Sequence, residues 1–266
     1  INLVTGNLDR PGGHMFAKPA FPLVGRKGNS HEFRRWSSRV RALPEFEGSL
    51  PTSVLAEEIL TPGEGQIKAL ITNAGNPVLS APNGKKMEQA LEGLDFYLAL
   101  DIYINESTRH ADLILPSPSG VETDHYDLIF NAVSVRNVAK YSAQTILPKP
   151  ELSYDWEIMK ELSFRIGKPS FLKSQVLKWA TPDRILNLAL SLGPYGAFRK
   201  PFSGGLNLKR LKEKPHGIDL GALKPCLPSA LRTQDRKINV VPEIYEEALA
   251  QLPCEPAEPI DGFQLI

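Results

Sequence analysis

Cysteine is almost absent from this chain, which contains only Cys226 and Cys254 among its 266 residues. Two thiols are too few for a disulfide framework, a four-cysteine zinc site or an iron–sulfur cluster. We interpret both cysteines as ordinary thiols. Their scarcity excludes reaction classes that need a cysteine-bound cluster built from these residues alone.

The sequence also lacks an excess of either charge and any long apolar run. Lysine and arginine number 31 against 30 aspartates and glutamates, so the formal net charge is +1. Such a chain presents no strong field to nucleic acid or to an acidic membrane surface. Apolar runs such as residues 69–71 and 98–100 are far shorter than the roughly 20 residues of a membrane span. We expect no nucleic-acid partner and no membrane span.

The ends of the chain carry neither an initiator Met nor a signal peptide. Residues 262–266 resemble the first residues of a strand that does not continue. We therefore expect an internal fragment of a longer polypeptide; a whole protein trimmed of a tag is the alternative. Localisation stays open, with the cytoplasm favoured over the periplasm.

The most regular part of the sequence predicts a parallel sheet. A buried strand, a helix with Met87, Ala90, Leu91 and Leu94 on one side, and two further strands follow one another. A strand–helix–strand unit at this spacing forms a right-handed crossover. The fold class is therefore α/β, a Rossmann-like parallel sheet with crossover helices. The expected elements are strands at residues 67–72, 96–100 and 112–115 and a helix at 85–94.

The flanking regions are expected to be helical or irregular. Four further helices are predicted: one opening near Ser49 and Pro51, one at 153–166, one from Thr181 to Gly193, and one at 241–252. Residues 128–139 should be extended and 194–228 irregular. The basic run at 34–41 is interpreted as a solvated helix face. We expect domains at 1–170 and 171–252, and a linker at 253–266.

Polar residues follow the first two predicted strands where each strand ends. Asn and Gly after a buried strand allow a tight turn that exposes amide donors to a phosphate or sugar. Asp101, at the end of the neighbouring strand, can accept hydrogen bonds from ribose hydroxyls or a guanine edge. The alternative is that these residues only form turns. Ligands of such sheets bind at the carboxyl ends of the strands.

Several motifs, taken together and in order, resemble the molybdopterin oxidoreductase family. Residues 99–116 are similar to its pattern of Asp, a spacer, Thr-Glu-Thr, then Ala-Asp and an apolar pair before Leu-Pro. Residues 6–13 resemble its Gly-Asn-Ile-Gly-Arg-Pro-Gly-Gly loop, and Asn73-Ala74-Gly75-Asn76-Pro77 resembles its Gly-x-Asn-Pro loop. The acidic turn at 120–124, the Asp-Trp helix start at 155–158 and a motif at 216–221 complete the set.

The resemblance implies one of two domains that together hold a bis(molybdopterin guanine dinucleotide) with Mo or W, as in the DMSO reductase and formate dehydrogenase type. One nucleotide arm would lie near the loop that follows the strand at 67–72. Its guanosine would contact the loop that follows the strand at 96–100, and the acidic turn at 120–124 would line the same side. The implied cofactor-binding residues are Asn73, Gly75, Asn76, Asp101, Asn105, Ser107, Glu122 and Asp124. Asn105 and Ser107 stand where the family often has Thr, and because both keep a hydrogen-bonding side chain we expect the role to be retained.

The family's remaining chemical groups are expected outside this chain. Its cysteine quartet for an iron–sulfur cluster and its metal ligand would precede Ile1, and its closing barrel would follow Ile266. We therefore assign no catalytic and no metal-binding residue here, and expect the isolated fragment to be inactive. The implied partners are the remaining domains of the polypeptide and electron-transfer subunits. The resemblance implies that substrate choice depends on residues near the metal, on partner subunits and on the funnel to the active site, most of which lie outside this chain.

Two other functions stay open. The large iron–sulfur subunit of NADH dehydrogenase shares this domain as an electron-transfer scaffold without pterin, and the acidic turns would then be architectural. An isolated nucleotide-binding module would bind GMP or GDP by itself. His125, between Asp124 and Asp127, could act as a general base, but we interpret it as a surface or loop histidine.

Overall fold

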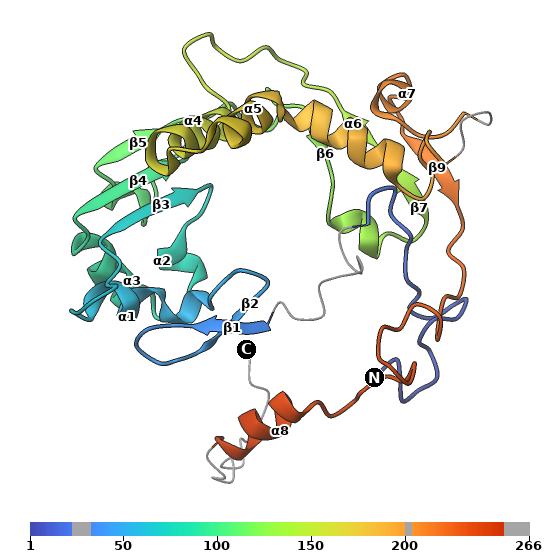
Figure 1. Cartoon of the computed structure of the whole chain (residues 1–266), viewed down its shortest axis with the longest axis horizontal. Coiled ribbons are helices and arrows are strands. Elements are labelled where there is room, and N and C mark those ends of the chain that lie inside the picture. Colours follow the sequence, from blue (N-terminus) through green and yellow to red (C-terminus); the bar gives the residue numbers. More distant parts are fainter. Residues whose placement is uncertain (23–32, 200–203, 253–266) are drawn as a thin grey trace, which may run out of the picture. The chain divides into compact units, whose positions relative to one another are not determined.

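The computed structural model describes residues 1–22, 33–199 and 204–252 (Figure 1). The expected linker at 253–266 and Cys254 lie outside these residues. Contacts divide the chain into a larger unit, residues 17–223, and a smaller unit formed by residues 1–16 and those from 224 on. The domain boundary expected at residue 170 falls inside the larger unit and stays a prediction. In the described part of the chain no helix is long and apolar enough to cross a bilayer.

A three-stranded parallel sheet forms the centre of the candidate site. Strands β3 (Ala69–Asn73), β4 (Phe96–Leu100) and β5 (Leu113–Leu115) lie in that order. Ala69 pairs with Phe96, and Leu98 pairs with Leu113. The predicted parallel sheet and the α/β class are confirmed. Parallel strands place their carboxyl ends at one edge, so the loops after β3 and β4 lie next to each other.

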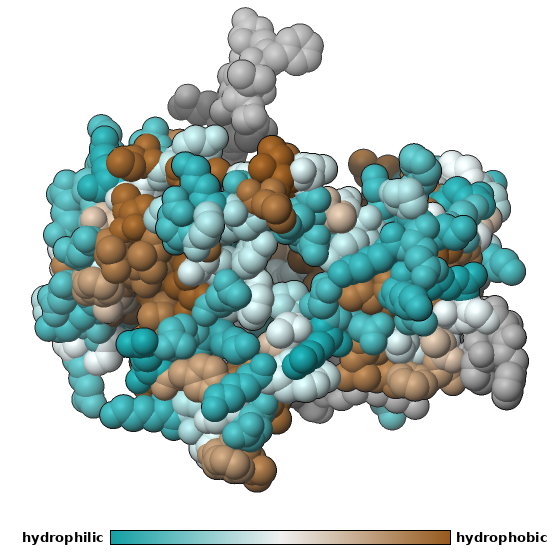
Figure 2. Space-filling model, turned by 90° about the horizontal axis from the view of Figure 1, so that it is seen from above, coloured by the Kyte–Doolittle hydropathy of each residue, from teal (hydrophilic) through white to brown (hydrophobic). Residues whose placement is uncertain are grey.

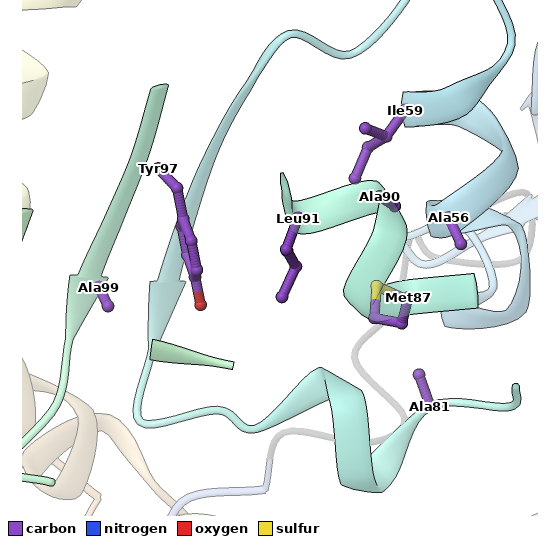
Figure 3. Close-up of a cluster of buried hydrophobic side chains, with 8 residues drawn as sticks. All are labelled: Ala56, Ile59, Ala81, Met87, Ala90, Leu91, Tyr97 and Ala99. Carbon is purple, nitrogen blue, oxygen red and sulfur yellow. The ribbon is translucent and has the colours of Figure 1, made fainter. Parts of the chain in front are cut away.

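One face of this sheet is covered by helices α1 (Leu55–Leu60) and α3 (Gly84–Glu92). The side chain of Asn83 caps α3 by accepting a hydrogen bond from the backbone N–H of Lys86. The predicted apolar side of this helix is confirmed. Figure 3 shows the resulting core between helices and strands, which contains Ala56, Ile59, Ala81, Met87, Ala90, Leu91, Tyr97 and Ala99.

The remaining sheets are two-stranded and antiparallel. They pair β1 (Phe33–Ser37) with β2 (Pro44–Phe46), β6 (His125–Tyr126) with β8 (Tyr141–Ser142), and β7 (Asn137–Ala139) with β9 (Ile218–Gly221). A second core holds Ala20, Ala139, Tyr141, Leu190, Leu206, Leu208 and Leu211. The other helices are α2 (Pro77–Ser80), α4 (Asp155–Gly167), α5 (Phe171–Trp179), α6 (Pro182–Leu192), α7 (Leu208–Lys212) and α8 (Glu243–Ala250), with 3-10 helices at Thr52–Val54, Thr108–His110 and Phe130–Val133.

Helices α1, α4, α6 and α8 confirm four sequence predictions. Helix α6 begins after Thr181, whose hydroxyl accepts a hydrogen bond from the N–H of Arg184, and ends at Gly193. Many apolar side chains of α4 and α5 stay exposed, including Ile166 and Phe171. Figure 2 shows several hydrophobic patches on the face that it draws. Helix α5 itself was not predicted.

Three sequence interpretations were wrong. The basic run at 34–41 forms most of β1 and the turn after it, and Arg35, Arg39 and Arg41 form ion pairs with Glu45, Glu58 and Glu57. Residues 128–139 contain a 3-10 helix before β7 rather than one extended segment. The region 194–228 contains α7 and β9. The first of these errors arises because tertiary pairing overrides local propensity.

Candidate functional site

The loop after β3 turns sharply and leaves its polar groups accessible. Asn73 and Ala74 are exposed, while Gly75 and Asn76 are half-buried. The backbone N–H of Ala74 donates to the carbonyl of Leu100 at 2.8 Å, which ties this loop to the end of β4. Ala74 makes the turn with a φ of 50°, in the left-handed region that favours glycine. Counting back from Asn76 and Pro77, Ala74 occupies the glycine position of the Gly-x-Asn-Pro pattern.

Two neighbouring backbone donors of this loop are open. Within the described residues, the N–H groups of Gly75 and Asn76 donate no hydrogen bond. A Cβ atom at Gly75 would have only the carbonyl of Asn73 nearby, at 3.8 Å, so the backbone there is not crowded. Consecutive free N–H groups are suited to an anionic or carbonyl oxygen.

The loop after β4 is organised by its own side chains. One carboxylate oxygen of Asp101 accepts from the N–H of Tyr103 at 3.0 Å, and the other accepts from the amide of Asn105 at 3.2 Å. The Asn105 Oδ1 accepts from the N–H groups of Ser107 and Thr108, each at 3.0 Å. Asp101 is therefore held in place from within its own loop, although it remains half-buried rather than fully enclosed.

Thr108 completes this loop and was not identified from the sequence. Its hydroxyl accepts from the N–H of Asn105 at 2.8 Å and donates to the carbonyl of Tyr103 at 3.0 Å. Asn105 and Thr108 thus bond to each other reciprocally, in the manner of a capping box, before the 3-10 helix Thr108–His110. The spacing of a polar residue and a Thr three positions later was the signal that could have revealed this.

Ser107 joins the two loops. It has no exposed surface, and its hydroxyl donates to the Oδ1 of Asn76 at 2.6 Å while accepting from the N–H of Val78 at 2.9 Å. The Nδ2 of Asn76 in turn donates to the Oε2 of Glu106 at 2.8 Å. Asn76 and Asp101 follow different strands. Ser107 and Asn105 connect them through one continuous set of hydrogen bonds.

Glu106 supplies a negative charge at this edge. The hydrogen bond from Asn76 is the main reason that its pKa lies below the ordinary value, and the nearby charge of Arg109 acts in the same direction. Its carboxylate is consequently ionised at neutral pH. The network thus presents amide donors beside carboxylate acceptors, and Glu106 is a member that the sequence had not singled out.

Glu122 and Asp124 form separate arrangements. Glu122 accepts from both the hydroxyl and the N–H of Ser119, which lowers its pKa. Asp124 accepts from the hydroxyl of Tyr141 at 2.6 Å and the N–H of Gln144 at 2.8 Å. Burial acts to raise the pKa of Asp124, but these hydrogen bonds outweigh it and the pKa lies below its ordinary value.

The structure therefore separates the predicted site residues into two groups. Chain continuity and side-chain hydrogen bonds bring together Asn73, Gly75, Asn76, Asp101, Asn105 and Ser107. Among the described residues, no hydrogen bond or ion pair joins Glu122 or Asp124 to this strand-end network. Within residues 1–22, 33–199 and 204–252, no group of three His, Cys, Asp or Glu side chains is placed to hold a metal ion.

Comparison with known proteins gives a consistent family match. A family model described as molybdopterin oxidoreductase matches residues 1–165. The assimilatory nitrate reductase catalytic subunit of Bacillus subtilis (strain 168) is 30% identical over 170 residues, covering 62% of this chain and 23% of that protein. Formate dehydrogenase H of Escherichia coli (strain K12) is 26% identical over 152 residues, covering 57% of this chain and 20% of that protein.

A solved structure shares the fold. Acetylene hydratase from Pelobacter acetylenicus superposes with a TM-score of 0.54 at 15% identity, covering 76% of this chain and 25% of that one. At this identity the likeness concerns the fold alone. The chain thus spans about a quarter of the length of that structure, and 23% of the length of the nitrate reductase subunit.

Proposed function

Because the chain belongs to the molybdopterin oxidoreductase family, we propose that its strand-end network binds the guanosine arm of a molybdopterin guanine dinucleotide. The observation that carries this proposal is the continuous hydrogen-bonded connection from Asn76 to Asp101 across two strand ends. A nucleotide needs donors for phosphate and carbonyl oxygens and acceptors for its hydroxyl and base N–H groups. Both kinds of group are present at this edge.

The residues fit the group in distinct ways. The open N–H groups of Gly75 and Asn76 suit a phosphate or carbonyl oxygen. The carboxylates of Asp101 and Glu106 can accept from ribose hydroxyls or from the base. Asn73 lies exposed at the end of β3, on the same edge. We also propose that Glu122 and Asp124 line the same side of the bound nucleotide. They belong to the turn at 120–124, which their own hydrogen bonds stabilise.

In the full-length protein the bound cofactor would supply redox chemistry at Mo or W. This chain would bind and orient the organic part and exclude water from it, so its residues act on position rather than on the reacting atoms. We propose that electron-transfer subunits and further domains of the same polypeptide complete the enzyme, and that an iron–sulfur cluster belongs to those domains. The isolated chain is expected to be inactive.

The test measures the nucleotide that the purified full-length protein carries. Acid hydrolysis should release GMP in fixed ratio to molybdenum or tungsten. Asp101→Ala should lower the GMP content, because a carboxylate acceptor for the nucleoside is lost. Asp127→Ala is the matched control, since the Oδ1 of Asp127 likewise accepts from the N–H two residues on, Ile129, at 2.9 Å.

Two outcomes would contradict the proposal. A wild-type protein free of pterin and metal would favour the electron-transfer scaffold. Equal GMP content in wild type and Asp101→Ala, with metal present, would mean that the guanosine does not bind at this network.

A further inference from the structure

We infer that Ser107 is a positioning residue that fixes the orientation of the Asn76 amide and thereby makes the strand-end network select guanine over adenine. This inference rests on the proposed function, because it concerns how the same site recognises its base. Ser107 has no exposed surface, and its hydroxyl bonds to Asn76 and to the N–H of Val78. Its influence has to pass through the side chain that it holds.

The orientation of the Asn76 amide follows from its two partners. An asparagine side chain carries an acceptor oxygen and a donor NH₂ of nearly the same shape, so neighbouring groups decide which way it points. The hydroxyl of Ser107 also accepts from the N–H of Val78, which leaves its own hydrogen for the Oδ1 of Asn76. The Nδ2 then faces Glu106, a carboxylate that can only accept.

The result is a fixed pattern at the half-buried edge. One hydrogen of the Asn76 Nδ2 bonds to Glu106 and the second is left to donate, next to a carboxylate whose oxygens can only accept. Guanine presents the O6 acceptor beside N–H donors, whereas adenine presents an N6 amino donor where guanine has O6. For bases that the sugar holds in the same orientation, a donor from Asn76 beside the acceptor of Glu106 therefore matches O6 and N1–H of guanine and opposes the N6 amino group and N1 of adenine.

Binding of GDP and ADP to cofactor-free full-length protein, measured by titration calorimetry, tests this inference. Wild type should prefer GDP. Ser107→Ala should reduce the ratio of the GDP to the ADP affinity by about tenfold, because the Asn76 amide is then free to turn over. Ser107→Thr keeps the hydroxyl and should retain the wild-type ratio.

Ser80→Ala is the matched control. The hydroxyl of Ser80 also bonds to Asn76, but to its backbone carbonyl at 2.9 Å, and Ser80 is exposed. This variant should keep the wild-type ratio. Asn76→Asp provides a second route if Ser107→Ala does not fold, because it keeps the side-chain shape and replaces the donor by an acceptor. It should lower the ratio at least as much as Ser107→Ala.

The outcomes separate the inference from the proposed function. A wild type that binds neither nucleotide contradicts the proposed function, and the inference with it. A wild type that prefers GDP, with the same preference in Ser107→Ala or Asn76→Asp, overturns only the inference. An equal loss in Ser80→Ala and Ser107→Ala would likewise overturn it, since the effect would then be general loosening of the loop.

Discussion

The loops after β3 and β4 lie at the same edge of one sheet but are stabilised differently. The loop after β4 uses its own side chains: Asn105 and Thr108 bond to each other's backbone, and Thr108 is fully buried. The loop after β3 contains a strained Ala74 and two N–H groups without a partner among the described residues. It is held from outside, by Ser107 of the neighbouring loop.

This difference shows how one site can be both rigid and open. A polar group bonded within the protein gives order but has less capacity left for a ligand. The loop after β4 supplies the order, and the loop after β3 supplies most of the unused donors. If this division holds, changes in the loop after β4 should mainly alter stability. Changes in the loop after β3 should alter stability less.

The largest effect is expected from Thr108→Ala. The variant leaves the N–H of Asn105 and the carbonyl of Tyr103 without the hydroxyl of Thr108, a side chain that has no exposed surface. An unsatisfied buried polar group costs about 1–3 kcal/mol. Hydrogen exchange of the full-length protein, followed by mass spectrometry over residues 101–111, should show faster exchange throughout the loop.

Thr145→Ala is the control for this change. The hydroxyl of Thr145 also donates to a backbone carbonyl, that of Val121 at 3.2 Å, but Thr145 is exposed. Water can replace that bond, so exchange should change little. Equal effects of the two variants would remove the proposed distinction between the loops.

A smaller effect of opposite sign is expected from Ala74→Gly. Ala74 has a φ of 50°, and relief of this left-handed conformation should outweigh the extra freedom that glycine gives the unfolded chain. The free energy of unfolding should rise by about 0.5–1 kcal/mol. The affinity for GDP should stay within about twofold, because the backbone N–H groups of the loop keep their places.

Ala42→Gly tests whether that gain is a property of the conformation. Ala42 is exposed, has a φ of 55° and lies in the turn between β1 and β2, away from the site. Chemical denaturation should give a similar gain for both variants. A loss of stability in Ala74→Gly alone would mean that the methyl group of Ala74 is needed by the loop.

The sequence predicted the regular parts of the fold because their signals are local. Strand β4 was placed residue for residue, and helix α6 was bounded by Thr181 and Gly193. The candidate residues at the strand ends could be found because the ends of parallel strands meet. Their grouping into one network follows from a topology that the spacing of the strands already indicated.

The rest depended on contacts between distant residues. Strand β1 and the turn after it contain arginines that resemble a helix surface, and ion pairs with Glu45, Glu57 and Glu58 account for three of them. The hydrogen bond of Asp124 with Tyr141, 17 residues further along the chain, is another contact that local sequence patterns do not indicate. The role of Ser107 was equally hidden, because its burial depends on the packing of both loops.

The smallest expected effect concerns pH and the carboxylate that the loop after β3 contacts. The pKa of Glu106 in the folded protein is held below its ordinary value near 4.5, chiefly by Asn76. Its contribution to stability is therefore fully present above that ordinary value and is lost as the pH falls through the folded-state pKa.

Glu106→Gln should make the thermal midpoint of the full-length protein less dependent on pH below about 4.5, and the difference should be small because Glu106 is exposed. Asp219→Asn is the comparison, since the hydrogen bond from Arg136 lowers the pKa of Asp219 in the same direction and Asp219 is not part of the proposed site. Both variants should therefore flatten the pH profile. Only Glu106→Gln should also weaken the preference for GDP over ADP at neutral pH, because its amide can turn a donor toward the base where the carboxylate only accepts. An equal loss of that preference in Asp219→Asn, a change in β9, would mean that the effect of Glu106→Gln does not arise from a contact of Glu106 with the base.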